Sequence, residues 1–279
     1  MWTARSHVLE EIQSLDPERD FARISYLSIC YDFPADVTGA LDLALLKGSC
    51  VPSISGLQAS TGEFVHRTQK RYDDTLLILA ELLESGYDSE RGRAAQRRMN
   101  RMHHRFPIAN DDYLYILSTS VVEPIRFNAR FGWRPYTENE KRAYFNLWVA
   151  IGYRMGIKAI PPTLAALERY HDEFERERFV FSPANHANAV AMIDLFSGWY
   201  PAPVRPLVRA GIRALLADDV LDALGLPRPS ARARRLTESL LDLRAGLQRL
   251  APRRTRPFLH TRRPHPSYPD GYRIEELGA

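Results

Sequence analysis

An arginine on the inward face of a predicted helix is the first candidate for chemistry. In the segment TQKRYDDTLLILAELL, helical periodicity places four residues within roughly 60° of one another: Arg71, Thr75, Ile78 and Leu82. Arg71 therefore shares an apolar stripe, and because a guanidinium does not lose its charge, its burial requires an anion. The partner is either a bound ligand or an internal carboxylate, unless Arg71 lies at the rim of the core and reaches solvent.

Two adjacent histidines follow about thirty residues later in SERGRAAQRRMNRMHHRFPI. One face of this predicted helix is apolar and consists of Ala95, Met99, Met102 and Phe106. His103 falls at the edge of that face, whereas His104 projects toward the arginine-covered side. A neutral imidazole among Met and Phe is suited to bind iron. The alternative is a half-buried histidine that is hydrogen-bonded to a backbone carbonyl.

Two Glu-x-x-His pairs offer a different metal chemistry. They are Glu63 with His66 and Glu168 with His171. In ferritin-like bundles, two such pairs and one Glu from each of two further helices bind two iron ions. The remaining carboxylates would come from Glu81, Glu84 or Glu123. A di-iron carboxylate helical-bundle oxidase is therefore an alternative interpretation.

Other enzyme signatures are absent from the sequence. It contains no Walker loop, no G-x-G-x-x-G, no G-x-S-x-G and no H-E-x-x-H. Aromatic residues are frequent, but their helical spacing is more typical of a protein core than of a cofactor box. They include Tyr113, Tyr115, Trp133, Tyr144, Phe145, Trp148 and Trp199.

The composition is that of a soluble globular protein, with 45% hydrophobic and 26% charged residues in a chain of 279. Uncharged apolar stretches such as LLILA at 76–80 fall far short of the ~20 residues that span a bilayer. The first residues, MWTARSHVLEEIQSLD, carry charges where a signal peptide has its apolar run, so we expect a cytoplasmic protein. Cys30 and Cys50 are too few for a disulfide framework, and we expect ordinary thiols.

A basic segment near the C-terminus sets the charge distribution. Residues 228–263 contain eleven Arg against Glu238 and Asp242, a local balance of +9 in a chain of net charge +4, so the other residues carry −5. Such a segment can bind nucleic acid or make peripheral contact with an anionic membrane. Its pattern also predicts an amphipathic helix that docks onto the core through Leu236, Leu240 and Leu243. We predict the docked helix, and we do not expect a nucleic-acid partner.

Helix start and stop signals predict an all-α fold. Thr137 with Glu140 forms a capping box, Gly156 follows the last turn of that helix, and Ser182 precedes Pro183 at another helix start. Asn110 and Asp111 are expected to cap DYLYILSTSVV, although its β-branched residues also permit a strand. We predict one helical domain over 1–250 and a Pro/Arg-rich tail over 251–279 that wraps the surface or is partly disordered.

Several of these motifs, taken in order, resemble a known family. Arg71-x-x-x-Thr75, then Met102-His103, then NDDYLYILSTSVVEPIRFNARFGWRPYT resemble the catalytic domain of MpaB-type oxygenases and rubber oxygenases, the latex-clearing proteins. The stretch MGIKAIPPTLAALERYHDEFERE adds to a resemblance that spans roughly residues 55–200. It implies an all-helical domain with a globin-like core that binds b-type heme and uses O2.

The resemblance also implies a heme site. Arg71 and Thr75 match the Arg-x-x-x-Thr motif near the heme, and His103 matches the proximal iron ligand, with His104 as the fallback if the alignment shifts by one. An inward arginine would then bind a heme propionate.

One position departs from the rubber oxygenases. They carry a Lys immediately before the Thr, on the distal side of the heme, and here that position is Asp74. The acidic residue that they carry upstream of the Arg motif has no match either, because Glu63 does not have its spacing. The catalytic residues of the distal side are therefore unassigned, and rubber cleavage itself is not implied.

The leading hypothesis is a heme-dependent oxygenase that acts with O2 on an apolar alkene, terpenoid or lipid-like substrate. Its pocket would be lined by residues such as Leu79, Leu117, Phe145 and Trp148. The alternatives are a non-catalytic heme- or ligand-binding protein on the same fold, the di-iron oxidase, and a nucleic-acid or membrane-surface protein.

Overall fold

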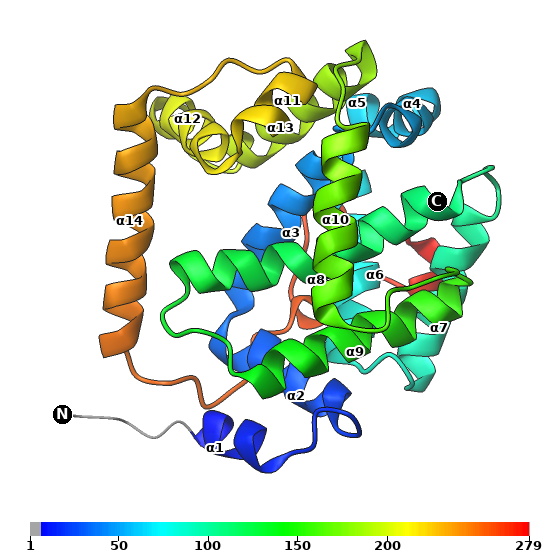
Figure 1. The fold of residues 1–279 in the computed structure, drawn as a ribbon, viewed down its shortest axis with the longest axis vertical. Coiled ribbons are helices and arrows are strands. Elements are labelled where there is room, and N and C mark those ends of the chain that lie inside the picture. Colours follow the sequence, from blue (N-terminus) through cyan, green and yellow to red (C-terminus); the bar gives the residue numbers. More distant parts are fainter. Residues whose placement is uncertain (1–6, 279) are drawn as a thin grey trace.

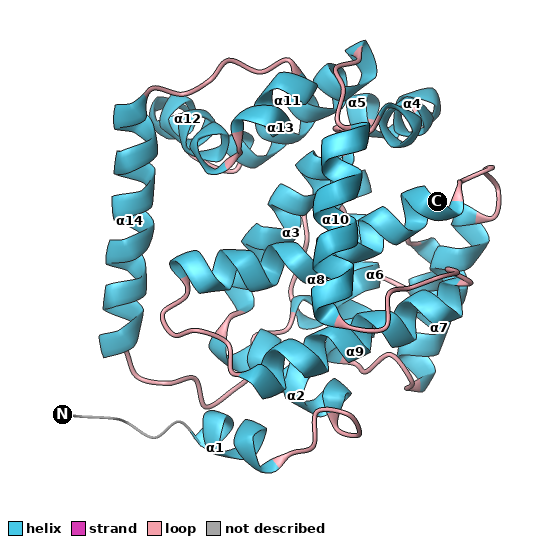
Figure 2. Cartoon of the chain, in the orientation of Figure 1, coloured by secondary structure: helices cyan, strands magenta, loops and turns pink. Residues whose placement is uncertain are grey.

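The computed structural model describes residues 7–278, and over that range the chain forms helices and loops without a β-strand (Figure 2). This confirms the all-α prediction. The described α-helices are α1 (His7–Ser14), α2 (Phe21–Leu27), α3 (Pro34–Gly48), α4 (Pro52–Thr61), α5 (Glu63–His66), α6 (Thr68–Glu84), α7 (Glu90–His103), α8 (Asn110–Phe131), α9 (Glu138–Met155), α10 (Leu164–Arg178), α11 (Pro183–Gly198), α12 (Arg205–Leu215), α13 (Asp218–Leu224) and α14 (Ala231–Leu250). Short helical turns lie at Ser28–Asp32, Ala202–Val204, His260–Arg262 and Ile274–Glu276.

Local signals place the ends of several helices. The Thr137 side chain accepts from the Glu140 backbone N–H, and Glu140 reciprocates at the start of α9, so the predicted capping box is present. Gly156 ends α9 in the left-handed region at φ 78°, which favours glycine. Ser182 caps α11 as expected.

Helix α8 corrects one prediction about a cap. The segment is a helix rather than a strand, but Ala109 occupies the N-cap position and makes no side-chain cap. The Asn110 side chain is instead used across the fold, where it accepts from the Lys158 backbone N–H at 2.8 Å. This tertiary contact competes with local capping for the same amide.

The largest core cluster lies where α8 meets its neighbours, with α3, α9 and α10 packed around it (Figure 1). Helices α6 and α7 pack against each other and contribute Leu77, Leu82 and Met99 to the same cluster. Of the four residues expected to line a pocket, Leu117, Phe145 and Trp148 belong to this cluster, and Leu79 is partly buried and packs against it. Both cysteines are buried free thiols, as expected.

The tail after Ala251 is packed against α6 and α7. The α6 carboxylates of Asp73, Asp74, Glu81 and Glu84 each bind a tail residue. Leu277 is fully buried, and its carbonyl accepts from Arg98 of α7 at 2.6 Å. Gly278 lies so close to Met102 that a side chain at that position would overlap it. The tail therefore reaches the end of α7, next to His103.

Helix α14 exists as predicted, but the prediction of which face docks onto the core was wrong. Leu236, Leu240 and Leu243 are exposed. The helix is instead held by Ala245, which is buried, and by Arg244, which pairs with Asp36. Periodicity identified the apolar stripe, but it could not show whether the protein itself covers that stripe.

No single helix in residues 7–278 is long and apolar enough to cross a membrane. Only α3 and α4 taken together pass on length and composition, and the two are bent by 96° relative to each other.

Candidate functional site

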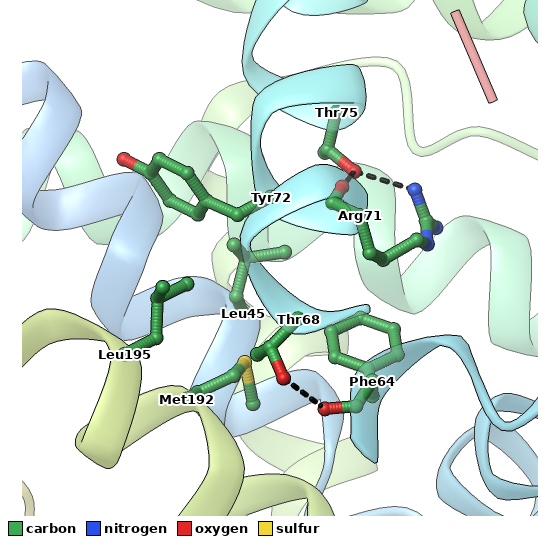
Figure 3. A pocket seen from close by; sticks show the side chains of 8 residues that line it. All are labelled: Leu45, Phe64, Thr68, Arg71, Tyr72, Thr75, Met192 and Leu195. Carbon is green, nitrogen blue, oxygen red and sulfur yellow. Dashed lines mark hydrogen bonds between the residues drawn. The ribbon is translucent and has the colours of Figure 1, made fainter. Parts of the chain in front are cut away.

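Arg71 and Thr75 form one unit on α6. The Arg71 Nη1 donates to the Thr75 hydroxyl at 2.6 Å, and that hydroxyl donates to the Arg71 backbone carbonyl at 2.9 Å. Figure 3 shows the guanidinium folded back toward Thr75, on the side of α6 away from Tyr72. The Phe64 ring lies below the guanidinium, with its centroid 5.3 Å from the Arg71 Cζ. The i, i+4 spacing thus holds the arginine in a fixed orientation.

The Arg71 side chain makes no ion pair with a described residue. Arg134, by contrast, binds both Asp32 and Glu140. Burial lowers the pKa of Arg71, with only partial compensation from the more distant Asp74 and Glu63. Among residues 7–278, no internal carboxylate pairs with Arg71, so its positive charge is available beside the α6 stripe.

His103 ends α7 as a half-buried, neutral imidazole. Its Nδ1 is buried and has no hydrogen-bond partner among the residues described. Burial, with smaller contributions from the charges of Arg71 and His104, lowers its pKa to about 4. The Tyr113 ring packs edge-on, 5.6 Å between centroids. A neutral nitrogen with a free lone pair is the form that binds a metal ion.

The neighbouring His104 is exposed at the C-cap of α7. The structure thus separates the two adjacent histidines as the helical face predicted. His103, and not the fallback His104, lies on the protein's interior side.

A narrow cavity of about 10 Å³ lies beside Arg71 and Thr75 (Figure 3). Its walls come from α3, α5, α6 and α11, and are formed by Leu45, Phe64, Thr68, Arg71, Tyr72, Thr75, Met192 and Leu195. Apart from Arg71, two threonines and the Tyr72 hydroxyl, this lining is apolar.

Asp74, at the position where rubber oxygenases carry Lys, faces the tail. The Tyr268 hydroxyl donates to its carboxylate, and Lys70 Nζ lies 3.0 Å from it. Lys70 also donates to Tyr268 at 3.0 Å, which closes a triangle of three side chains. Asp74 is buried. Its charge is therefore used in attaching the tail.

A second polar group, which could not be predicted in full from the sequence, lies between α3, α8 and α10. Lys47 Nζ lies 2.7 Å from Glu123 and 2.8 Å from Glu175, and His171 Nε2 lies 3.3 Å and 2.9 Å from the same two carboxylates. His171 is fully buried, and the other three side chains are largely buried. Burial opposes all four charges, yet the pKa of His171 is raised and that of Glu123 is lowered to about 2, because the opposite charges outweigh burial. We call these four residues the charge cluster.

The predicted di-iron set is not brought together. Within the described residues, the group whose side chains could converge on a metal ion is Glu123, His171 and Glu175, with the Lys47 ammonium between the carboxylates. Glu63 instead pairs with Arg67 on the surface. Glu81 and Glu84 bind the tail. The i, i+4 spacing of His171 and Glu175 was the signal available in the sequence for part of this cluster.

Comparison with known proteins agrees with the expected resemblance. Residues 37–250 match the family described as "ER-bound oxygenase mpaB/B'/Rubber oxygenase, catalytic domain". That range covers most of the chain and extends beyond the 55–200 expected from motifs. The chain therefore belongs to the mpaB/rubber oxygenase catalytic-domain family.

Three similar proteins come from Penicillium species. The chain is 29% identical over 223 residues to the ER-bound oxygenase mpaB of Penicillium brevicompactum, covering 72% of this chain and 57% of that protein. It is 31% identical over 134 residues to the mpaB of Penicillium roqueforti (strain FM164), covering 46% of this chain and 45% of that protein. The mpaB' of Penicillium brevicompactum is 27% identical over 176 residues, with 57% of this chain and 42% of that protein covered. The chain spans about half the length of these relatives.

Proposed function

We propose that the chain is a heme-dependent oxygenase that acts with O2 on an apolar alkene, terpenoid or lipid-like substrate. The observation that carries the proposal is the juxtaposition, on two packed helices, of a neutral imidazole with an unpartnered nitrogen and an arginine without an anion. Membership in a family of oxygenase catalytic domains supports the reaction class. The names of the relatives describe oxygenases as well.

The residues present suit a heme group. The buried Nδ1 atom of His103 has no hydrogen-bond partner in the described chain, so this residue would supply the iron ligand. Arg71, oriented by Thr75, would bind a propionate by charge-assisted hydrogen bonding. Because the cavity beside Arg71 holds only about 10 Å³, a porphyrin requires the surrounding side chains to move apart.

The protein's own contributions are positioning and exclusion of water. The heme, when bound, supplies the O2 chemistry. Low polarity keeps His103 neutral at pH 7, since its pKa is about 4. Leu79, Leu117, Phe145 and Trp148 would supply an apolar surface for the substrate. No residue is assigned to distal proton transfer, because Asp74 is bound by Tyr268 and Lys70.

Absorption spectra of the protein, expressed with ample heme precursor, test the site. We expect a Soret band that shifts on dithionite reduction, disappears in His103→Ala and persists in the adjacent control His104→Ala. A Soret band retained in full by His103→Ala would reject the ligand assignment. Two irons per chain without a Soret band would favour non-heme iron.

Arg67, at the start of the same helix, provides a matched control for Arg71. Arg71→Gln should weaken heme affinity by about tenfold or more, since a charge-assisted hydrogen bond contributes roughly 1.5–3 kcal/mol. Arg67→Gln, which removes a surface arginine paired with Glu63, should leave the affinity unchanged. Equal heme affinity of the two variants would contradict the role of Arg71.

A second candidate function is a heme- or ligand-binding protein without turnover. The engagement of Asp74 with the tail favours it, because no free acid–base group stands at that position. Oxygen uptake by the heme-loaded protein, with reductant and an alkene-bearing terpenoid, separates the two. Sustained substrate-dependent uptake supports the oxygenase, and its absence across apolar alkenes supports the binding protein.

A cytoplasmic location remains part of the proposal. The names of the relatives describe those proteins as ER-bound, so association with a membrane surface is compatible with it.

A further inference from the structure

Helix α14 presents a stripe of leucines to solvent. Leu236, Leu240, Leu243, Leu247 and Leu250 are between 57% and 85% exposed. Their spacing of four, three, four and three places them on one side of the helix, over a length of about 21 Å. Isolated exposed leucines are ordinary, but five in one continuous row mark an interaction surface. We call these five residues the leucine stripe.

The orientation of α14 is set by contacts on its other sides. Arg234 pairs with Asp218, Arg244 pairs with Asp36, and the Arg249 Nε donates to the Trp133 carbonyl at 2.6 Å. Ala245 provides the close approach to the core. Figure 1 shows α14 at the edge of the molecule, between α12 and the start of the tail. These contacts hold the leucine stripe outward.

Cationic side chains stand at both ends of the leucine stripe. Arg232 and Arg235 precede it, and Arg254 and Arg256 follow it; all four are exposed. The ion pairs that this helix makes within the described chain involve other residues, Arg234, Glu238 and Arg244. The four terminal arginines therefore remain available to an anionic partner.

A second copy of the chain is a poor occupant of this surface. An antiparallel pairing of two α14 helices centred on Leu243 would place Arg232 opposite Arg254 of the other copy. A parallel pairing would place each arginine beside its own counterpart. Both arrangements bring like charges together at both ends of the apolar contact, which opposes association.

An anionic lipid surface satisfies both features at once. Leucines enter the boundary between headgroups and acyl chains, while arginines bind the phosphates around them. We propose that the leucine stripe of α14, with Arg232, Arg235, Arg254 and Arg256, is a peripheral docking surface for an anionic phospholipid membrane. This inference is independent of heme and of turnover.

Vesicle co-sedimentation of the full chain tests the proposal. Vesicles of phosphatidylcholine alone are compared with vesicles that also contain phosphatidylserine. We expect binding to the anionic vesicles, weakened by salt, and at least tenfold weaker binding by Leu240→Glu/Leu247→Glu. Because both leucines are exposed, this variant should keep its far-ultraviolet circular dichroism spectrum.

Two further variants separate apolar insertion from bulk charge. Val65→Glu/Tyr153→Glu adds the same two charges at exposed apolar positions on α5 and α9 and should bind like the unmodified chain. Arg232→Gln/Arg235→Gln should lose the preference for phosphatidylserine. Equal weakening in both Glu variants would show charge attraction without insertion and would overturn the proposal.

Three other results would overturn it as well. The first is the absence of binding to anionic vesicles. The second is a dimer, seen in sedimentation velocity, that only Leu240→Glu/Leu247→Glu dissociates, together with no vesicle binding. The third is salt-dependent binding to DNA without binding to vesicles.

Discussion

Two inward-facing histidines of this protein have opposite surroundings. His171 lies between two carboxylates in the charge cluster, and its pKa is raised. His103 lies among apolar groups near Arg71, and its pKa is lowered to about 4. The first histidine has two carboxylates of the chain within 3.3 Å of its Nε2. The second makes no ion pair with a described residue, and its Nδ1 has no hydrogen-bond partner among them. Charges that are balanced within the chain, as in the charge cluster, stabilise the fold. Groups without a partner in the chain, as at His103, form a site for a bound ligand.

The largest expected effect is on the charge cluster. Lys47→Met removes the ammonium between Glu123 and Glu175 and leaves His171 as the one cationic partner of the two carboxylates. The free energy of unfolding should fall by about 3–5 kcal/mol, the usual cost of breaking a buried pair. Urea unfolding measures it.

Lys141→Met is the control, since Lys141 pairs with Glu138 on the surface. It should change stability by less than about 1 kcal/mol. Equal losses in the two lysine variants would mean that the charge cluster has no special structural role.

Alanine at each histidine compares the two sites directly. In the heme-free protein, His171→Ala should cost about 3 kcal/mol, because it leaves Glu123 and Glu175 short of positive charge. His103→Ala should stay within about 1 kcal/mol, since it removes an imidazole that no hydrogen bond at Nδ1 secures. Thermal or urea unfolding of both variants measures the two losses in the free energy of unfolding. If His103→Ala proves the more damaging of the two, the contrast between open and closed sites is refuted.

The two histidines should also give opposite pH dependences. Below pH 6.5 an unfolded His103 takes up a proton that the folded protein refuses until about pH 4, so this residue lowers stability progressively as the pH falls through that window. The raised pKa of His171 acts in the other direction, because its stabilisation is full below pH 6.5 and is lost as the pH rises through the folded-state value.

Unfolding free energies of His103→Gln and His171→Gln, each subtracted from the unmodified chain between pH 4 and 8, reveal the two slopes. Slopes of the same sign would contradict the assigned surroundings.

The smallest effect is expected at Thr75. Thr75→Val keeps the shape of the side chain and removes the hydroxyl that orients Arg71. We expect a loss of about 1 kcal/mol in heme affinity, roughly fivefold, and little change in stability of the heme-free chain. Heme titration measures the affinity, and Thr75→Ser should restore it. An unchanged affinity in Thr75→Val would show that Arg71 needs no orienting partner.

The sequence predicted what depends on local periodicity. The inward position of Arg71, the separation of His103 from His104 and the cap at Thr137 all follow from the geometry of single helices. The charge cluster could not be predicted in full, because its members come from three helices far apart in sequence.

The same limit explains the error at α14. An amphipathic pattern shows that a stripe exists, and only the tertiary fold shows that Leu240 faces solvent. The heme, the distal chemistry and the substrate stay predictions, since no contact among the described residues reports on them.

The attachment of the tail orders events during synthesis. Asp74 and its partner Tyr268 are 194 residues apart, so α6 leaves the ribosome long before the segment that donates hydrogen bonds to its carboxylates. At a translation rate of about 5–20 residues per second, this delay lasts roughly ten to forty seconds. Throughout that interval α6 and α7 lack the covering that Leu277 later provides beside Met102. The neighbourhood of His103 is thus completed only after synthesis of the helical domain.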